Sequence, residues 1–234
     1  MSKKIFITGC AKSGTTLLLR MFYAFKNMDV LYRKGFDGHE LSFEEFIKYK
    51  SDKPFVVGKR HPPALLSNVL MPNFEEQHDK IKKESIAIIN VVRDGRDVVL
   101  SDGKWVKPRR WIESIRQRGM FKDVIDLEVK YEDLIKYPGR MQNEIEQRFG
   151  LESEHSFKDY PDYVEDWVFE WNVSVLARAG DESAKQNYGK RKLGTQSIGK
   201  DLNAYKEICD EFEIPAFESC LKTLGYMKEE MTNG

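Results

Sequence analysis

The residues best suited to chemistry lie in a short segment near the start of the chain, Gly9-Cys-Ala-Lys-Ser-Gly-Thr-Thr16. An apolar run precedes this segment, and a leucine-rich helical pattern follows it directly. A glycine-bounded turn between a strand and a helix presents backbone N–H groups to an anion, and Lys12 adds a positive charge there. The segment indicates a phosphate-binding loop, and the alternative is a chance glycine turn between a strand and a helix, since short motifs also match by chance.

The loop departs from the ATP-binding pattern G-x-x-x-x-G-K-[ST] at the lysine position. Gly9, Gly14 and Thr16 fit this pattern, but Thr15 stands where the lysine would be. The cation has moved back to Lys12, which directs its ammonium group at a different part of the ligand. We therefore expect a phosphate-bearing ligand other than an ordinary nucleoside triphosphate.

A second group of candidate residues follows the apolar run Ile86–Val92, whose length and branched side chains predict a buried parallel strand. The run ends in Arg93-Asp-Gly-Arg-Asp-Val-Val-Leu-Ser101. Its Asp-Gly turn predicts a following helix, with Arg93 at the carboxyl edge of the strand and Ser101 about two turns into the helix. Ligands bind at that edge of open α/β sheets, so both motifs should face one crevice. The alternative is that Arg93 only pairs with Asp97 or another carboxylate.

Together, the two motifs resemble the sulfotransferase family that uses 3′-phosphoadenosine 5′-phosphosulfate (PAPS) as donor. In that family a K-S-G-T-T loop binds the 5′-phosphosulfate, and an arginine and a serine eight positions later bind the 3′-phosphate. The matching residues here, without a gap, are Lys12, Ser13, Gly14, Thr15 and Thr16 for the loop, and Arg93 and Ser101 for the second motif. The resemblance implies PAPS as donor, 3′-phosphoadenosine 5′-phosphate (PAP) as product, and no required metal.

Two further segments are similar to the same family. Phe55–Pro63 looks like the family's strand ending in K-x-H, whose histidine is the general base, which implies this role for His61. Lys59, two residues before His61, is a candidate to assist at the sulfuryl oxygens, and the alternative is an ordinary cap at the strand end. Val129–Leu134 is similar to the family's Y-E-D-L segment, whose tyrosine lies near the adenine. Tyr131 is the corresponding residue.

A third segment, Lys190–Lys200, stands where the family carries a basic, glycine-containing loop that closes over the 3′-phosphate. It departs from the family patterns R-x-G-x-W and R-K-G, because one residue separates its Arg-Lys pair from Gly194. The cation that contacts the phosphate is therefore left open among Arg191, Lys192 and Lys200.

The general base has two candidates. Sulfuryl transfer, like phosphoryl transfer, passes through a loose transition state, so alignment and charge stabilisation, here by Lys12, dominate catalysis. A histidine suits removal of the acceptor's proton, and His61 lies just past a strand end, although a histidine before two prolines is also a plausible turn residue. Glu40 is the rival, because carbohydrate and protein-tyrosine branches of the superfamily use a glutamate from the region after the first helix.

A P-loop kinase or nucleotide hydrolase using ATP and magnesium is the competing enzyme class. There Thr16 would bind the metal and a strand-end aspartate would complete the site. The sequence has Arg93 directly after the strand instead, so Asp94 would have to serve from one position late. A degenerate nucleotide fold that acts only as an interaction module is the non-enzymatic alternative.

Composition fits one compact enzyme domain. The chain has 234 residues, of which 41% are hydrophobic, and 38 basic residues balance 38 acidic ones, which argues against a general nucleic-acid or acidic-membrane binder. Three irregularly spaced cysteines and the lack of a long apolar run favour a cytoplasmic protein without a disulfide scaffold, a metal site or a membrane span. The expected acceptor is a small molecule or a carbohydrate, and the oligomeric state stays open.

Strands alternating with helices predict an α/β fold, with a central parallel sheet flanked by helices as in P-loop nucleotide-binding proteins, in one sulfotransferase-like domain over residues 1–234. The expected strands are 4–8, 55–59, 86–92 and 126–130. The expected helices are 14–27, 73–83, 96–102, 109–118, 131–149, 162–178, 201–213 and 215–224.

Overall fold

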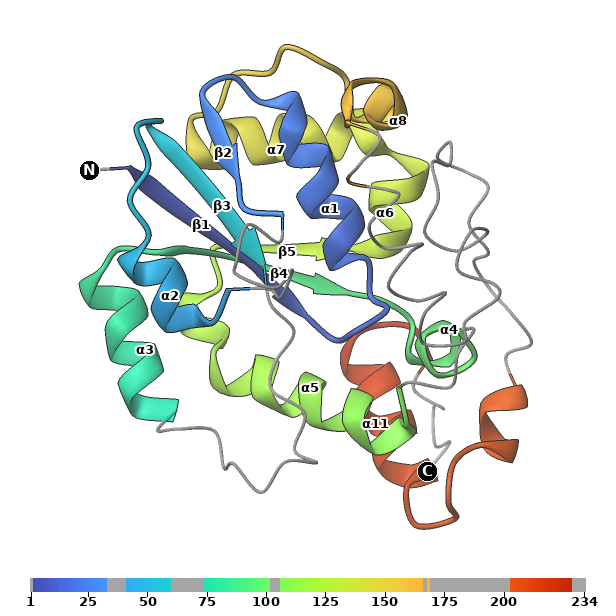
Figure 1. Ribbon diagram of the computed structural model, residues 1–234. Coiled ribbons are helices and arrows are strands. Elements are labelled where there is room, and N and C mark those ends of the chain that lie inside the picture. The colour runs from blue at the N-terminus through green and yellow to red at the C-terminus, as the bar shows by residue number, and fades with distance from the viewer. Residues whose placement is uncertain are drawn as a thin grey trace.

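The computed structural model describes residues 2–32, 41–59, 74–101, 106–165, 168 and 203–228. Five parallel strands form the centre of the molecule, in the order β2-β3-β1-β4-β5 (Figure 1). The strands are β1 (Lys3–Gly9), β2 (Met28–Val30), β3 (Phe55–Lys59), β4 (Ala87–Val92) and β5 (Leu127–Lys130). The predicted parallel α/β architecture is confirmed.

The strand order places the loops after β1 and β4 side by side. From β1 the chain continues to β2 and β3 on one side of the sheet, whereas β4 leads on to β5 on the other side. Neighbouring strands whose connections leave in opposite directions mark the position at which open α/β sheets bind ligands. Lys12 lies in the loop after β1, and Arg93 directly follows β4.

Helices cover both faces of the sheet: α1 and α7 lie on one face, and α2, α3 and α5 lie on the other (Figure 1). The α-helices are α1 (Thr15–Met21), α2 (Phe43–Lys48), α3 (Phe74–Lys83), α4 (Gly95–Val99), α5 (Pro108–Met120), α6 (Tyr131–Lys136), α7 (Pro138–Phe149), α8 (Tyr160–Tyr163) and α11 (Ile214–Thr223). Short 3₁₀ helices are η1 (Phe22–Ala24), η3 (Lys122–Val124), η4 (Phe157–Asp159) and η5 (Ala204–Glu207).

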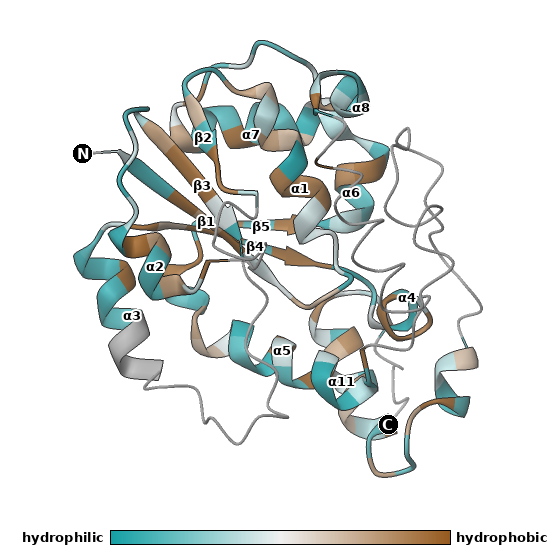
Figure 2. Ribbon diagram, in the orientation of Figure 1, coloured by the Kyte–Doolittle hydropathy of each residue, from teal (hydrophilic) through white to brown (hydrophobic). Residues whose placement is uncertain are grey.

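Apolar strands between two helical layers make up the core (Figure 2). Because side chains alternate along a strand, Ile5 and Ile7 of β1 pack with α1 and α7, whereas Phe6 faces the opposite layer. There Phe6 contacts the rings of Phe43 and Phe46, at centroid distances of 5.1 and 5.0 Å. All six residues of β4 are buried, as expected of a parallel strand covered on both faces.

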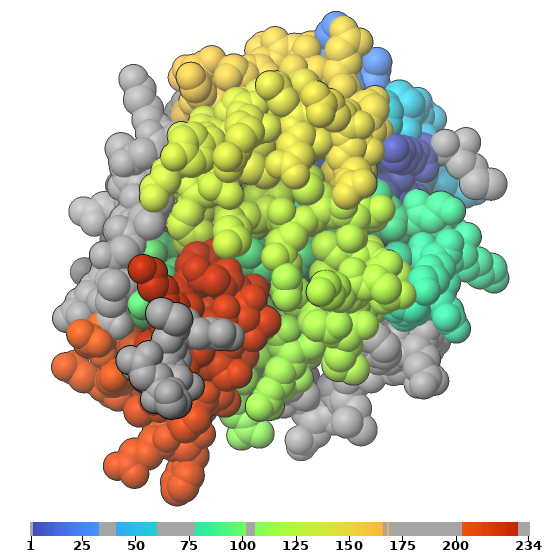
Figure 3. All heavy atoms as spheres, turned by 180° about the vertical axis from the view of Figure 1, so that it is seen from behind, coloured from blue at the N-terminus to red at the C-terminus, as the bar shows by residue number. Residues whose placement is uncertain are grey.

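The C-terminal residues 203–228 pack against α5. Figure 3 shows them, orange to red, at one end of the rear surface beside the lime-coloured residues that include α5. The contact centres on Trp111 of α5 and Phe217 of α11, whose ring centroids are 4.6 Å apart. Among the described residues, no helix combines the length and the apolar character needed to cross a bilayer.

Several predicted helices differ in their limits. The helix expected over 131–149 is two helices, because Pro138 restricts the preceding residue and Tyr137 takes φ −132° and ψ 51°. Gly150 caps α7 with φ 70°, as predicted. The helix expected over 14–27 ends at Met21 and continues only as η1. The short elements β2 and α2 are not among the strands and helices expected above, although Ser42 and Glu45, which form a capping box, are a local sign of the start of α2.

The helices expected toward the C-terminal end are confirmed only in part within the described residues. α8 ends at Tyr163, since Val164 is extended, and of the rest of the range 162–178 only residues 165 and 168 are described. Val168 is fully buried in the core cluster. Within the described part of 201–213, the only helical segment is η5. The helix expected over 215–224 is confirmed as α11.

Candidate active site

The loop after β1 owes its shape to three residues with positive φ. These are Gly9 (143°), Lys12 (69°) and Gly14 (99°). A Cβ atom on Gly9 would lie 2.3 Å from the carbonyl oxygen of Val91, so only glycine permits the close approach of the loop to β4. The loop closes on itself through Ser13, whose N–H and Oγ both donate to the carbonyl of Cys10, at 3.1 and 2.6 Å.

The predicted donor-binding residues of this loop divide into buried and accessible ones. Ser13 and Thr15 are each 1% exposed, whereas Lys12 and Thr16 are half-buried. The hydroxyl of Ser13 therefore holds the loop together in this structure rather than facing outward. No side-chain hydrogen bond caps the N-terminus of α1, which begins after Gly14.

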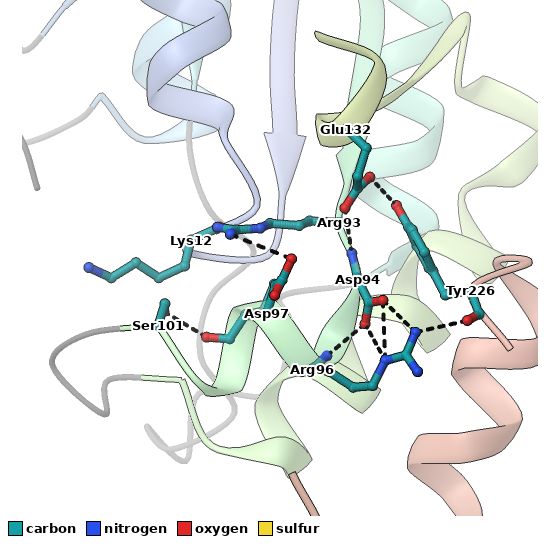
Figure 4. A network of polar contacts seen from close by, with 9 residues as sticks. Lys12, Arg93, Asp94, Arg96, Asp97, Ser101, Glu132 and Tyr226 are labelled. Atoms are coloured by element: carbon teal, nitrogen blue, oxygen red, sulfur yellow. Dashed lines mark hydrogen bonds and ion pairs between the residues drawn. The ribbon is translucent and has the colours of Figure 1, made fainter. Parts of the chain in front are cut away.

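Arg93 brings the two motifs together. Its Nη1 donates to the carbonyl oxygen of Lys12 at 3.0 Å, so the end of β4 is bound directly to the loop after β1. The side chain is largely buried, and its Nη2 lies 3.9 Å from Oδ2 of Asp97. The pairing with Asp97, considered as the alternative to a ligand contact, is present alongside the contact to the loop. Figure 4 shows the guanidinium beside the Lys12 backbone, while the Lys12 ammonium points away from it.

Ser101 lies beyond the helix in which it was expected. α4 ends at Val99, and the hydroxyl of Ser101 donates to the carbonyl of Val98 at 2.7 Å (Figure 4). The helix predicted over 96–102 is thus shorter than expected. Ser101 is half-buried and follows the same short helix that begins two residues after Arg93.

Tyr131 packs beneath the same arginine. Its ring centroid lies 4.3 Å from Cζ of Arg93, and a Cβ atom on Gly14 would lie 2.4 Å from its Cδ2. The ring is buried between the loop and the guanidinium, so in this structure it supports both. Lys59 is 5% exposed at the end of β3, and its register partner in β1 is Ile7.

The structure also contains a polar network that the sequence analysis missed (Figure 4). Asp94 accepts from the N–H of Arg96 at 2.9 Å and caps α4, and it binds the guanidinium of the same arginine at 2.6 Å. Glu132 and Tyr226 complete this network from α6 and from the residues after α11. The only sequence signal for it was the position of Glu132 in the Y-E-D-L segment, and nothing in the sequence pointed to Tyr226.

Burial changes the acidity of groups near the loop. It raises the pKa of the Cys10 thiol to about 12, partly offset by the charge of Arg110. Cys10 is therefore a protonated, packed residue of the loop rather than a nucleophile. Burial, with the charge of Glu132 next in importance, raises the pKa of the Tyr226 hydroxyl far above its ordinary value, so the hydroxyl remains a donor.

No protein-family model matches the sequence, and neither does any curated protein. Solved structures do match. The sulfotransferase domain from the curacin biosynthetic pathway superimposes with a TM-score of 0.55 at 14% identity, over 98% of this chain and 99% of that one. The chain has the sulfotransferase fold.

Two other structures with the sulfotransferase fold are similar to the chain. One is mouse sulfotransferase SULT7A1 complexed with PAP, with a TM-score of 0.49 and 12% identity over 99% of this chain and 86% of that one. The other is the sulfotransferase domain of the olefin synthase of Synechococcus PCC 7002, with a TM-score of 0.49 and 13% identity over 98% of each chain.

Five predicted site residues lie outside the described part of the chain: Glu40, His61, Arg191, Lys192 and Lys200. Their predicted roles stay predictions. Within the described residues of this sulfotransferase fold, no three His, Cys, Asp or Glu side chains gather in a way that could hold a metal ion.

Proposed function

We propose that the chain is a sulfotransferase, which moves the sulfuryl group of PAPS to a hydroxyl or amine of a small-molecule or carbohydrate acceptor by in-line transfer. One observation carries the proposal: the 3.0 Å hydrogen bond from Arg93 to the carbonyl of Lys12. It joins the two motifs that resemble the family's 5′-phosphosulfate and 3′-phosphate sites, at the edge of the sheet where such folds bind ligands. The proposed unit is one domain over residues 1–234.

The residues present suit a bisphosphorylated nucleotide. The loop after β1 supplies backbone N–H groups and the Lys12 ammonium for the 5′-phosphosulfate, with the half-buried Thr16 as a further hydroxyl. Arg93 offers a planar guanidinium already fixed by its neighbours, which suits the 3′-phosphate, together with Ser101. One cation among Arg191, Lys192 and Lys200 is proposed to close over the same phosphate.

The proposed reaction is a single displacement at sulfur. The bond between sulfur and the bridging phosphate oxygen breaks, a bond from sulfur to the acceptor oxygen or nitrogen forms, and PAP leaves. Lys12 stabilises the charge that develops on the leaving oxygen, with Lys59 assisting at the sulfuryl oxygens. The acceptor's proton passes to a general base, for which His61 is the first candidate and Glu40 the second.

The alternative of an ATP- and magnesium-dependent kinase loses support from the contacts of Asp94. A strand-end carboxylate that binds a metal has to be available to it, whereas Asp94 caps α4 and is paired with Arg96. Binding a magnesium ion would require breaking this half-buried pair.

Thermal unfolding with ligands tests the proposal without knowledge of the acceptor. A ligand that binds only the folded chain raises the midpoint, by an amount that corresponds to about 2.7 kcal/mol at a hundredfold excess over Kd. We expect PAP alone to raise the midpoint, with no effect of a chelator. Lys12→Ala should abolish the rise, whereas Lys158→Ala, at an exposed position, should retain it. A rise only with ATP and magnesium would overturn the proposal in favour of the kinase.

An acceptor screen then separates the two candidate bases. Loss of transfer in His61→Ala, with PAP binding and folding intact, would support the histidine. Unchanged transfer in this variant would move the assignment to Glu40, to be tested by Glu40→Gln.

A further inference from the structure

Four residues close a ring of hydrogen bonds directly after Arg93 (Figure 4). The backbone N–H of Asp94 donates to Oε1 of Glu132 at 3.2 Å, and the Tyr226 hydroxyl donates to Oε2 of the same carboxylate at 2.7 Å. Arg96 completes the ring, because its Nη2 donates to the carbonyl of Tyr226 at 2.8 Å and to Oδ2 of Asp94 at 2.6 Å. The ring joins three elements: the turn after β4, the first turn of α6, and the residues after α11.

The ring acts on the peptide bond that carries Arg93. The N–H donated by Asp94 belongs to the peptide between Arg93 and Asp94, so Glu132 fixes the backbone orientation from which the arginine side chain departs. The neighbouring residue, Tyr131, packs against the guanidinium at the other end of that side chain. Two adjacent residues of α6 thus hold both ends of Arg93.

The turn at the end of α11 places Tyr226 in this ring of hydrogen bonds. Gly225 has φ 74°, its N–H bonds to the carbonyl of Lys222, and the N–H of Tyr226 bonds to the carbonyl of Leu221. This pair of bonds is the Schellman ending of a helix, in which a left-handed glycine turns the chain back. Lys130 secures the same turn, since its ammonium donates to the carbonyl of Leu224 at 3.2 Å.

Glu132 is chemically specific for its place in the ring. It accepts one hydrogen bond on each oxygen, from two donors that approach from different elements. Glutamine of the same shape has one acceptor oxygen and one NH₂ donor. With its oxygen toward the Asp94 N–H, it turns its NH₂ toward the Tyr226 oxygen, which must then accept, so the Tyr226 hydroxyl proton loses this acceptor. Hydrogen bonds to a charged carboxylate are also stronger than those between neutral groups.

We propose that Glu132 and Tyr226 are positioning residues for the donor 3′-phosphate: they hold the Arg93–Asp94 peptide so that the guanidinium is in place before the nucleotide binds. This inference rests on the proposed function, which assigns the 3′-phosphate to Arg93. It gives the residues after α11 a role in donor recognition, at a distance from the phosphate loop along the chain.

Discrimination between PAP and AMP tests the inference, because the two ligands differ by the 3′-phosphate alone. Isothermal titration gives both Kd values for the full chain, for Tyr226→Phe, for Glu132→Gln and for the double variant. Tyr137→Phe is the matched control, since Tyr137 is a 52% exposed tyrosine next to Arg140 on the surface. Circular dichroism checks that each variant is folded at the temperature of titration.

We expect each single variant to bind PAP about five- to tenfold more weakly and AMP within about twofold of the unmodified chain. The double variant should bind PAP no more weakly than the weaker-binding single variant, since both substitutions remove the same hydrogen bond between Tyr226 and Glu132. Unchanged PAP binding in both single variants, or an equal loss for PAP and AMP, would overturn the inference while leaving the proposed function intact. Failure of the unmodified chain to bind PAP would overturn the proposed function itself, and the inference with it.

Discussion

The guanidinium of Arg93 lies over the ring of Tyr131, with 4.3 Å between Cζ and the ring centroid, while its Nη1 reaches the Lys12 carbonyl at 3.0 Å. A planar group can stack on a ring with its face and donate hydrogen bonds from its edge at the same time. The compact ammonium of lysine cannot do both. Arg93 is therefore placed by its shape as much as by its charge.

The first prediction concerns this shape. Arg93→Lys keeps the charge but loses the stacked, forked geometry, and we expect the Kd for PAP to rise by about tenfold or more. Arg140→Lys is the control, because Arg140 combines the same chemistry on the surface, 4.8 Å from the Tyr137 ring centroid and 3.0 Å from Asp133. Titration calorimetry with PAP compares the two, and equal affinities would show that charge alone suffices at Arg93.

A second prediction concerns Gly14. Its φ of 99° and the 2.4 Å separation between an added Cβ and the Tyr131 ring mean that Gly14→Ala strains the backbone and displaces the ring below Arg93. We expect a loss of about 1–3 kcal/mol in the free energy of unfolding and weaker PAP binding. Urea titration followed by circular dichroism measures the first, and calorimetry the second.

Gly139→Ala is the matched control for this substitution. Gly139 lies in α7, and nothing comes within 4 Å of an added Cβ there. Since alanine has less conformational freedom than glycine in the unfolded chain and fits the first turn of α7, this variant should unfold at an equal or higher urea concentration. If both variants lost the same stability, the close approach of Gly14 to Tyr131 would not be the cause.

A third prediction concerns Gly95 and Trp111. A Cβ atom on Gly95 would lie 2.6 Å from Cε2 of the buried Trp111, so Gly95→Ala should lower the free energy of unfolding by roughly 1–3 kcal/mol. Trp111→Phe removes the clashing atoms and no hydrogen bond, because the indole Nε1 has no partner among the described residues. In a double-mutant cycle the two losses should be clearly less than additive. Strictly additive losses would show that the contact between Gly95 and the Trp111 ring does not affect stability.

A fourth prediction concerns the cysteines and pH. Burial raises the pKa of Cys10 to about 12 and that of Cys209 to about 11, and it raises that of Cys220 as well. All three cysteines are at most 9% exposed, so iodoacetamide at pH 8 should modify the folded protein only slowly. In urea, the same reagent should modify all three cysteines. Mass spectrometry counts the modified sites, and rapid alkylation of Cys10 in the folded protein would contradict its packed position.

The same thiols predict a loss of stability in alkali. The pKa of these thiols is higher in the folded state than in the unfolded state. Their contribution to the free energy of unfolding is therefore complete below the unfolded pKa of about 9, and it is lost as the pH rises toward 12. Urea midpoints should therefore fall between pH 9 and 11, and Cys10→Ala should show a smaller fall than the unmodified chain. An equal fall in both would assign the alkaline loss to other groups, the buried tyrosines first.

Much of the sheet and part of the site could be predicted because their signals are local. The apolar runs that became β1, β3 and β4 are bounded by charges and turns, and the two motifs lie where those strands end. The three-residue strand β2 was missed because it is too short to show a period. The break at Pro138 was missed because an apolar pattern continues across it, although the proline was a local sign.

The contacts between distant segments could not be predicted in the same way. The sequence placed Arg93 and Lys12 at one edge but gave no indication that one would donate to the backbone of the other. It gave no partner for Glu132, since Tyr226 is 94 positions further along the chain in a segment without a recognised motif. Such pairs depend on how helices pack against one another, and the hydrophobic pattern of a single segment does not encode that packing.

The bond from Arg96 to the Tyr226 carbonyl spans 130 positions of the chain. Contacts between segments so far apart close long loops. Closing such a loop costs chain entropy, and this loss must be offset before the contact adds to stability. During refolding, the sheet can pair its strands while α11 is still undocked, so nucleotide binding should be recovered later than the circular dichroism of the sheet. In the native state, a brief detachment of residues 203–228 would expose the Asp94 amide to hydrogen exchange with the strands still protected. The fraction of molecules whose proposed donor site is ordered then depends on how often residues 203–228 detach.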